Sequence, residues 1–134
     1  MEYVVDAHPL VWHFFTPTRL GSAARTILRD AEAGAHQIYL PAVALAEIIM
    51  VIERGRIPGV PMSQLITRLS MTQNLASFDF LPLLPDTIIN SHNLTAIPDI
   101  FDRLIVAEAV RLGLPLITRD SVIRASGLVT AVWD

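Results

Sequence analysis

Acidic residues follow two segments of the chain that are expected to be buried strands. Asp6 comes directly after the β-branched and aromatic run Tyr3–Val5, and Asp120 comes just after Leu116–Thr118. In open α/β sheets the functional groups lie beyond the carboxyl ends of the strands. We therefore expect Asp6 and Asp120 to lie at one edge of a sheet, where they could share a site.

Three further acids lie on segments that are expected to be helices. Glu47 is in the apolar segment 42–52, where an ionised carboxylate is costly unless it is paired, protonated or bound to a cation. Asp99 and Asp102 are three residues apart, so they share one face of a helix expected at 99–111. Two strand ends, one buried helix and one helix start can all face the same sheet edge.

Each acid also has an ordinary structural explanation. An Asp that follows a strand is often a turn former or an N-cap. Asp99 follows Pro98 and is a natural N-cap, whereas Asp102 could simply complement the helix dipole. Glu47 is the hardest to explain in this way, because its neighbours are apolar. The combination of all five acids favours a functional site.

Clustered carboxylates need a compensating charge. At about 4 Å and an effective dielectric of about 20, each like-charged pair costs on the order of 4 kcal/mol. A divalent cation relieves that repulsion, and an all-oxygen set of ligands suits Mg²⁺ or Mn²⁺. Without metal, at least one of the carboxyl groups should have a raised pKa. Such ions activate water and hold phosphodiesters for in-line attack, so the chemistry predicted is metal-dependent phosphoester hydrolysis.

The elements that must position these acids alternate along the chain. We expect helices at 9–15, 22–33 (capped by Ser22), 41–54 (buried nearly all round), 63–73, 86–93 and 99–111, with strands at 3–5, 37–40, 78–84, 114–118 and 128–133. A short turn of helix follows Asp120. This alternation predicts an α/β fold with one mostly parallel sheet and helices on both faces. No linker or repeat interrupts the chain, so residues 1–134 should form a single domain.

The composition excludes several classes of protein. The chain has no Cys, and all ten of its basic residues are Arg. Disulfides, thiolate metal sites, Schiff bases, Walker-type phosphate loops and receiver-type phosphorylation switches are therefore excluded. A phosphotransferase of the haloacid-dehalogenase type needs a Lys, which this chain lacks, and an Asp at position 8, where this chain has His8. No membrane span or signal peptide is visible, so a cytoplasmic protein is expected.

The net charge of −3 argues against a protein that holds nucleic acid mainly through a basic surface. Something other than the net charge must then attract any polyanion, and a bound metal ion would do so. Several other residues could still take part in binding. Trp12, Phe14 and Phe15 could stack on bases, although aromatic residues on a first helix are more often core or dimer contacts. His8 and His13 are too far apart to form a one-turn ligand pair.

Seven arginines are candidates for phosphate contacts: Arg19, Arg25, Arg54, Arg56, Arg103, Arg119 and Arg124. Arg103 could instead pair with Asp99.

The segments that carry the acids resemble those of the PIN-domain ribonucleases, and among them the VapC-type toxins of prokaryotic toxin–antitoxin pairs. The resemblance covers almost the whole chain and rests on four motifs in order: Tyr3–His8, Leu45–Ile48, Asp99–Ala109 and Leu116–Asp120. It implies a PIN fold, cleavage of RNA with Mg²⁺ or Mn²⁺, and a complex with a cognate antitoxin. Two alternatives stay open: a housekeeping PIN nuclease of RNA processing and a non-catalytic binding module with the same fold.

Carried over by position, the family's catalytic, metal-binding acids correspond to Asp6, Glu47, Asp102 and Asp120. Asp99 stands where many relatives have a further acid, and Thr118 matches a hydroxyl residue that can support the ligands. Ala7 departs from the Thr or Ser that is common after the first Asp, and Gly21-Ser22 shifts a usual Ser by one position.

A homodimer is also expected. The mean hydropathy of +0.49 and the apolar helices near the N-terminus and at 42–52 offer more hydrophobic surface than one small core readily buries. The resemblance implies the same oligomeric state.

Overall fold

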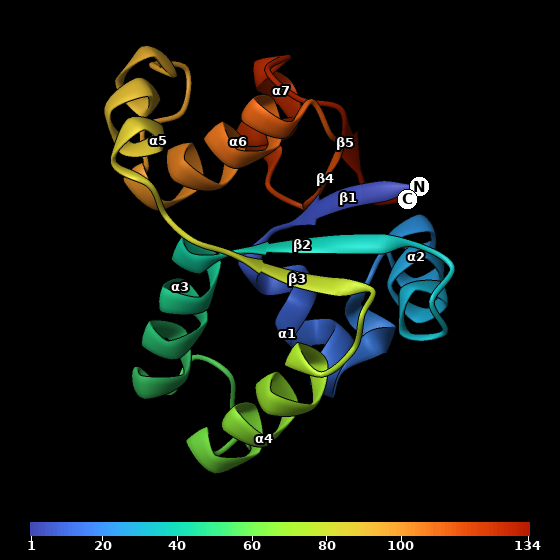
Figure 1. Cartoon of the computed structure of the whole chain (residues 1–134). Helices are drawn as coiled ribbons and strands as arrows, with labels where there is room; N and C mark the ends of the chain where they lie inside the picture. The colour runs from blue at the N-terminus through green and yellow to red at the C-terminus, as the bar shows by residue number, and fades with distance from the viewer.

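A five-stranded parallel sheet forms the centre of the structure, a computed structural model that describes all 134 residues (Figure 1). The strands are β1 (Glu2–Val5), β2 (Gln37–Pro41), β3 (Phe78–Leu81), β4 (Leu116–Ile117) and β5 (Ala131–Val132). The helices are α1 (Ala7–Phe15), α2 (Ser22–Glu32), α3 (Ala42–Glu53), α4 (Met62–Gln73), α5 (Pro85–Asn90), α6 (Ile100–Leu112) and α7 (Ser121–Ser126), with 3₁₀ turns at Pro17–Arg19 and Ser91–Asn93. The predicted α/β class is confirmed.

The order in which strands are added to the sheet reverses at β1, in the middle of the sheet. The order is β3-β2-β1-β4-β5, and every neighbouring pair is parallel. Because parallel crossovers are right-handed, the helices α1–α4 that connect β1, β2 and β3 lie on one face. The chain then crosses to the other side of β1, and α5–α7 cover the opposite face (Figure 1). The gap between the ends of β1 and β4 is therefore the point at which ligands bind in open α/β sheets.

The core surrounds the central strand. Val4 and Val5 of β1 are fully buried, as are Leu116 and Ile117 of β4, which pair with them. Parallel strands that are covered on both faces consist of such apolar runs. The same burial fixes the position of Asp6, the first residue after β1.

Two local expectations are wrong. Ser22 does not cap α2: the N-cap is Gly21, and the carbonyl of Trp133 accepts a hydrogen bond from the Ala24 N–H at 3.1 Å. A Cβ at Gly21 would lie 2.2 Å from that carbonyl oxygen, so the close approach of the C-terminal segment decides where the helix begins. Helix α3 is not buried all round either, because Ala46 is exposed and Glu47 is half-buried.

No helix in the structure combines the length and the apolar character needed to cross a bilayer.

Candidate functional site

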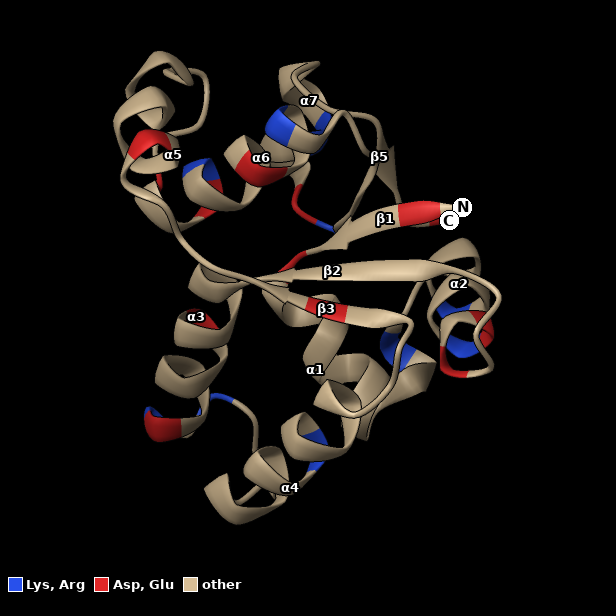
Figure 2. Cartoon of the chain, viewed as in Figure 1, with Lys and Arg blue, Asp and Glu red and all other residues tan.

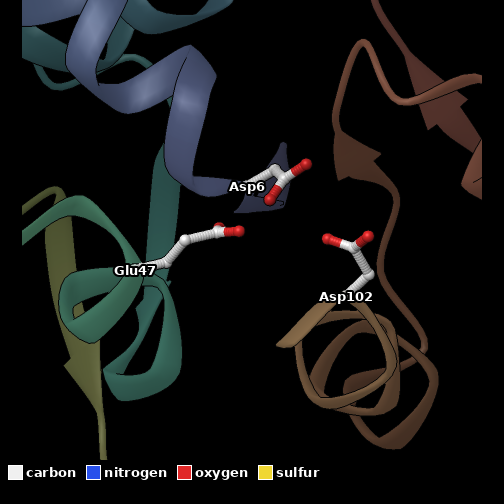
Figure 3. A group of neighbouring side chains, drawn as sticks. All are labelled: Asp6, Glu47 and Asp102. Atoms are coloured by element: carbon white, nitrogen blue, oxygen red, sulfur yellow. The ribbon is translucent and has the colours of Figure 1, made fainter. Parts of the chain in front are cut away.

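Three carboxylates converge at the carboxyl end of β1, the strand at which the order of the sheet reverses. Asp6, Glu47 and Asp102 each offer one oxygen, and these oxygens lie within 4.8 Å of one another. Figure 3 shows the three side chains pointing into a common space from the end of β1, from α3 and from the start of α6. Helices α3 and α6 pack against each other, which brings residues 55 positions apart in sequence to the same place.

Asp6 is held in place by two hydrogen bonds. The N–H of Ala7 donates to its Oδ1 and the hydroxyl of Thr118 donates to its Oδ2, each at 2.8 Å. The Thr118 hydroxyl also accepts a hydrogen bond from the Asp120 N–H at 3.1 Å. Thr118 is fully buried, so it ties the end of β4 to the end of β1 and orients the Asp6 carboxylate.

Glu47 has a buried oxygen without a partner. Its Oε2 is shielded from solvent and accepts no hydrogen bond. Burial, followed by the nearby charges of Asp6 and Asp102, raises the pKa of the Glu47 carboxyl to about 7. An unsatisfied buried carboxylate oxygen that faces two other carboxylates needs a proton or a cation.

The other two acids of the cluster are perturbed in the same direction. Burial, followed by the charges of Asp6 and Asp120, raises the pKa of Asp102 to about 7. Burial also raises the pKa of Asp6, although the hydrogen bonds from Thr118 and Ala7 oppose the shift. The expectation of at least one raised carboxyl pKa is confirmed. Near neutral pH the metal-free cluster therefore holds protons that a cation would displace.

Asp120 and Asp99 lie farther out. Asp120 lines the same pocket, and its side chain caps α7 by accepting from the Ile123 N–H at 2.9 Å. Asp99 caps α6 by accepting from the Asp102 N–H at 3.1 Å, and it does not line the pocket. Four of the five predicted acids thus share one pocket, whereas the fifth serves as the expected helix cap.

The pocket around the acids has a volume of about 550 Å³. Besides Asp6, Glu47, Asp102 and Asp120, its wall contains His8, Pro9, Trp12, Arg119 and Ser121. Ser121 had no signal in the sequence other than its place after Asp120. The sequence does not show which side of α1 or which loop faces the pocket, so it does not assign roles to His8, Trp12 and Arg119.

Several other candidate residues have structural contacts elsewhere. His13 pairs with Glu32 at 2.8 Å, and burial lowers its pKa. Phe14 lies under the guanidinium of Arg68, whose carbon is 4.6 Å from the ring centroid. Arg103 does not pair with Asp99, since its Nε donates to the Ile97 carbonyl.

The donor set fits a hard divalent cation. The three converging ligands are all carboxylates, and none of the nine residues lining the pocket is a Cys. The unpartnered Glu47 Oε2 is the atom that such an ion would satisfy. Oxygen ligands from a few carboxylates, with room left for water and substrate, are typical of Mg²⁺ and Mn²⁺ sites.

Comparison with known proteins agrees with this geometry. The family model described as PIN domain matches residues 3–127. No curated protein is similar enough in sequence to match the chain.

Solved structures share the fold at low sequence identity. VapBC2 from Rickettsia felis, bound to a DNA fragment from their promoter, has a TM-score of 0.72 and 14% identity over the full length of both chains. FitAcB from Neisseria gonorrhoeae has a TM-score of 0.62 and 15% identity, over 96% of this chain and 95% of that one. PAE2754 from Pyrobaculum aerophilum has a TM-score of 0.53 and 16% identity, over 98% of this chain and 90% of that one.

Proposed function

Since the chain belongs to the PIN-domain family, we propose that it is a metal-dependent endoribonuclease and the toxin of a toxin–antitoxin pair. The observation that carries the proposal is the convergence of Asp6, Glu47 and Asp102 within 4.8 Å at the switch point of the sheet. An incomplete set of acids would have favoured a non-catalytic binding module, whereas all three converging acids are present in this chain.

Each acid has a distinct part in the proposed site. Asp6, Glu47 and Asp102 would hold Mg²⁺ or Mn²⁺, and Asp120 adds negative charge on the neighbouring wall. The bound cation would supply a water of lowered pKa and would hold the phosphodiester. Thr118 keeps the Asp6 carboxylate in one orientation, because it donates to Oδ2 while the backbone donates to Oδ1.

The test is cleavage of single-stranded or loop RNA by the purified protein. We expect cleavage in Mg²⁺ or Mn²⁺ and none in EDTA. The products should have 5′-phosphate and 3′-hydroxyl ends, because water attacks the phosphorus and the 3′-oxygen leaves. Cyclic phosphate ends, or activity that persists in EDTA, would contradict the proposal. Loss of activity in Asp6→Asn, with the fold intact, is the matched control for a contaminating nuclease.

The proposed protein partner is a cognate antitoxin. The resemblance to VapC-type toxins implies one, and the similar VapBC2 and FitAcB structures support it at the level of the shared fold. We expect a short reading frame next to this gene to encode a protein that co-purifies with the chain and abolishes its RNA cleavage. A housekeeping nuclease would lack such a neighbour.

A homodimer is proposed on the exposed apolar surface of α5 and α6. Leu84, Ile88, Ile89 and Val110 are all 45–63% exposed, and Leu84 and Val110 line an apolar pocket of about 330 Å³. Exposed apolar groups gathered in this way are typical of an interface. The mass of one chain is 14.8 kDa, and light scattering at micromolar concentration should give twice that mass. The thermal midpoint of unfolding should fall on dilution.

A further inference from the structure

Two arginine side chains lie against the indole ring of Trp12, at the wall of the acidic pocket. The guanidinium carbons of Arg19 and Arg119 are 4.9 Å and 5.6 Å from the ring centroid. The ring is only 7% exposed and meets Trp133 edge-on at 5.9 Å. Because Trp12 is fixed in the core, it holds both guanidinium groups near one place.

The two guanidinium groups, named here the arginine pair, have no ionic or hydrogen-bonding partner within the chain. Neither makes an ion pair within 4.0 Å or donates a hydrogen bond. Arg119 is notable because it lines a pocket with four acids and pairs with none of them. Most other arginines are already bonded: Arg25, Arg29, Arg68, Arg103, Arg111 and Arg124.

Position distinguishes the arginine pair from the remaining unbonded arginines. Arg54 and Arg56 also lack partners, but they follow the end of α3 and do not line the pocket. Figure 2 shows the basic segments dispersed over several helices and loops, with no single element collecting them. Arg119 is therefore the one unbonded arginine that lines the pocket with the acids, and Arg19 lies next to the pocket through its contact with the lining residue Trp12.

A phosphodiester chain entering this pocket meets strong negative charge. A cation would neutralise the acids around the bond that is cut, but the next phosphates of the strand carry charges of their own. A guanidinium matches the geometry of phosphate oxygens, and a fixed one loses little conformational freedom on binding. The arginine pair is placed for this purpose, with Arg119 inside the pocket and Arg19 beyond the same ring.

We propose that Arg119 and Arg19, held on Trp12, bind the phosphate groups next to the bond that is cut and so set the path of single-stranded RNA across the pocket. This inference rests on the proposed function, because it assigns the substrate contacts of the same site. It also assigns Trp12 a role as a positioning residue. Its ring is largely buried and already faces two guanidinium groups, so it is a poor surface for a base.

Kinetics of RNA cleavage in Mn²⁺ test the proposal first. Arg119→Ala should raise KM about 10- to 100-fold, the loss expected for a hydrogen bond to a charged group. Arg119→Lys should recover part of that loss, because Lys keeps the charge without the planar fork. Arg29→Ala removes the same charge from an exposed side chain that pairs only with Asp30, and it should leave KM unchanged.

Salt dependence separates substrate binding from a purely structural role. Each lost phosphate contact should reduce the slope of log affinity against log salt by about 0.7 for a single strand. Arg119→Ala and Arg19→Ala should each show this reduction, whereas a destabilised fold would leave the slope unchanged. Trp12→Phe keeps an aromatic core residue but weakens the cation–π contact, so Arg119→Ala should have a smaller effect in that background.

Fluorescence anisotropy of a labelled single-stranded RNA, measured on Asp102→Asn protein in Mg²⁺, separates this proposal from the proposed function. If the unmodified chain cleaves no RNA but Arg119→Ala still lowers the affinity, the arginine pair is supported and the proposed function fails. Cleavage and affinity that are both unchanged in Arg119→Ala overturn the arginine pair alone. Undetectable binding of RNA also overturns the arginine pair. So does an Arg119→Ala variant that loses affinity for a polyglutamate peptide, used as a second polyanion, but not for RNA.

Discussion

Asp99 and Asp102 are one turn apart, and a single hydrogen bond separates their roles. The Asp99 carboxylate accepts from the Asp102 N–H, whereas the Asp102 carboxylate faces Asp6 and Glu47. We expect Asp102→Asn to abolish cleavage and weaken Mn²⁺ binding with no loss of metal-free stability. Asp99→Asn should keep the cap, worth ~1 kcal/mol, and lower activity only in part. Cleavage assays and calorimetric Mn²⁺ titrations of both variants decide, and the opposite pattern would reverse the assignment of the ligand.

Asp6 offers a sharper separation of chemistry from stability. In Asp6→Asn the remaining oxygen can still accept from the Ala7 N–H, and the new amide can donate to the Thr118 hydroxyl. Because burial penalises the charged carboxylate, the metal-free protein should be as stable as the unmodified chain or more stable. Cleavage should be lost. A clear fall in the free energy of unfolding in EDTA, measured by urea titration, would instead indicate a structural role for Asp6.

Among the secondary-structure elements, the start of α2 depends on the end of the chain. A Cβ at position 21 would overlap the Trp133 carbonyl, so Gly21→Ala must displace the C-terminal segment or the helix. We expect the free energy of unfolding to fall by about 1–3 kcal/mol, the usual cost of overpacking. Ser22→Ala is the control: Ser22 is exposed and makes no capping bond, so its loss should be almost neutral. Equal stability of the two variants in urea would refute this account.

Some features of the helices and strands can be predicted from the sequence, and others cannot. Buried apolar runs locate β1 and β4, so the acids that follow them could be placed at the sheet edge from the sequence. The cap at Asp99 was local and therefore predictable as well. Contacts between distant segments could not be predicted: the Trp133 carbonyl, more than 100 residues along the chain, decides the start of α2. For the same reason the neighbours of Trp12 emerged only in three dimensions.

For the molecule as a whole, the raised pKa values of Glu47 and Asp102 make stability depend on pH. Both carboxyls have a pKa of about 7 in the folded chain and near 4 when unfolded, so between these values the folded state binds more protons. Stability of the metal-free protein should therefore fall as pH rises from about 4 to about 7 and then level off.

Thermal unfolding checks this dependence directly. In EDTA the midpoint Tm should be lower at pH 7.5 than at pH 5.5, by about 3–6 °C. In excess Mn²⁺ the stabilisation should grow over the same interval, because cation binding requires deprotonated ligands. Glu47→Gln should flatten the profile in EDTA. A Tm in EDTA that rises across this range would contradict the raised pKa values of Glu47 and Asp102.

The position of β1 in the middle of the sheet has a consequence for how the protein is made. β1 is the first strand to be synthesised, yet its β4 neighbour spans residues 116–117 and the last pocket acid is residue 120. As the chain grows, the β1–β2–β3 half can form while one edge of β1 is still open. Asp6 lacks the Thr118 hydroxyl until that edge is covered. If Asp6 acts as proposed, we expect the ribosome-bound chain to be inactive until β4 has joined the sheet and Thr118 can orient the Asp6 carboxylate.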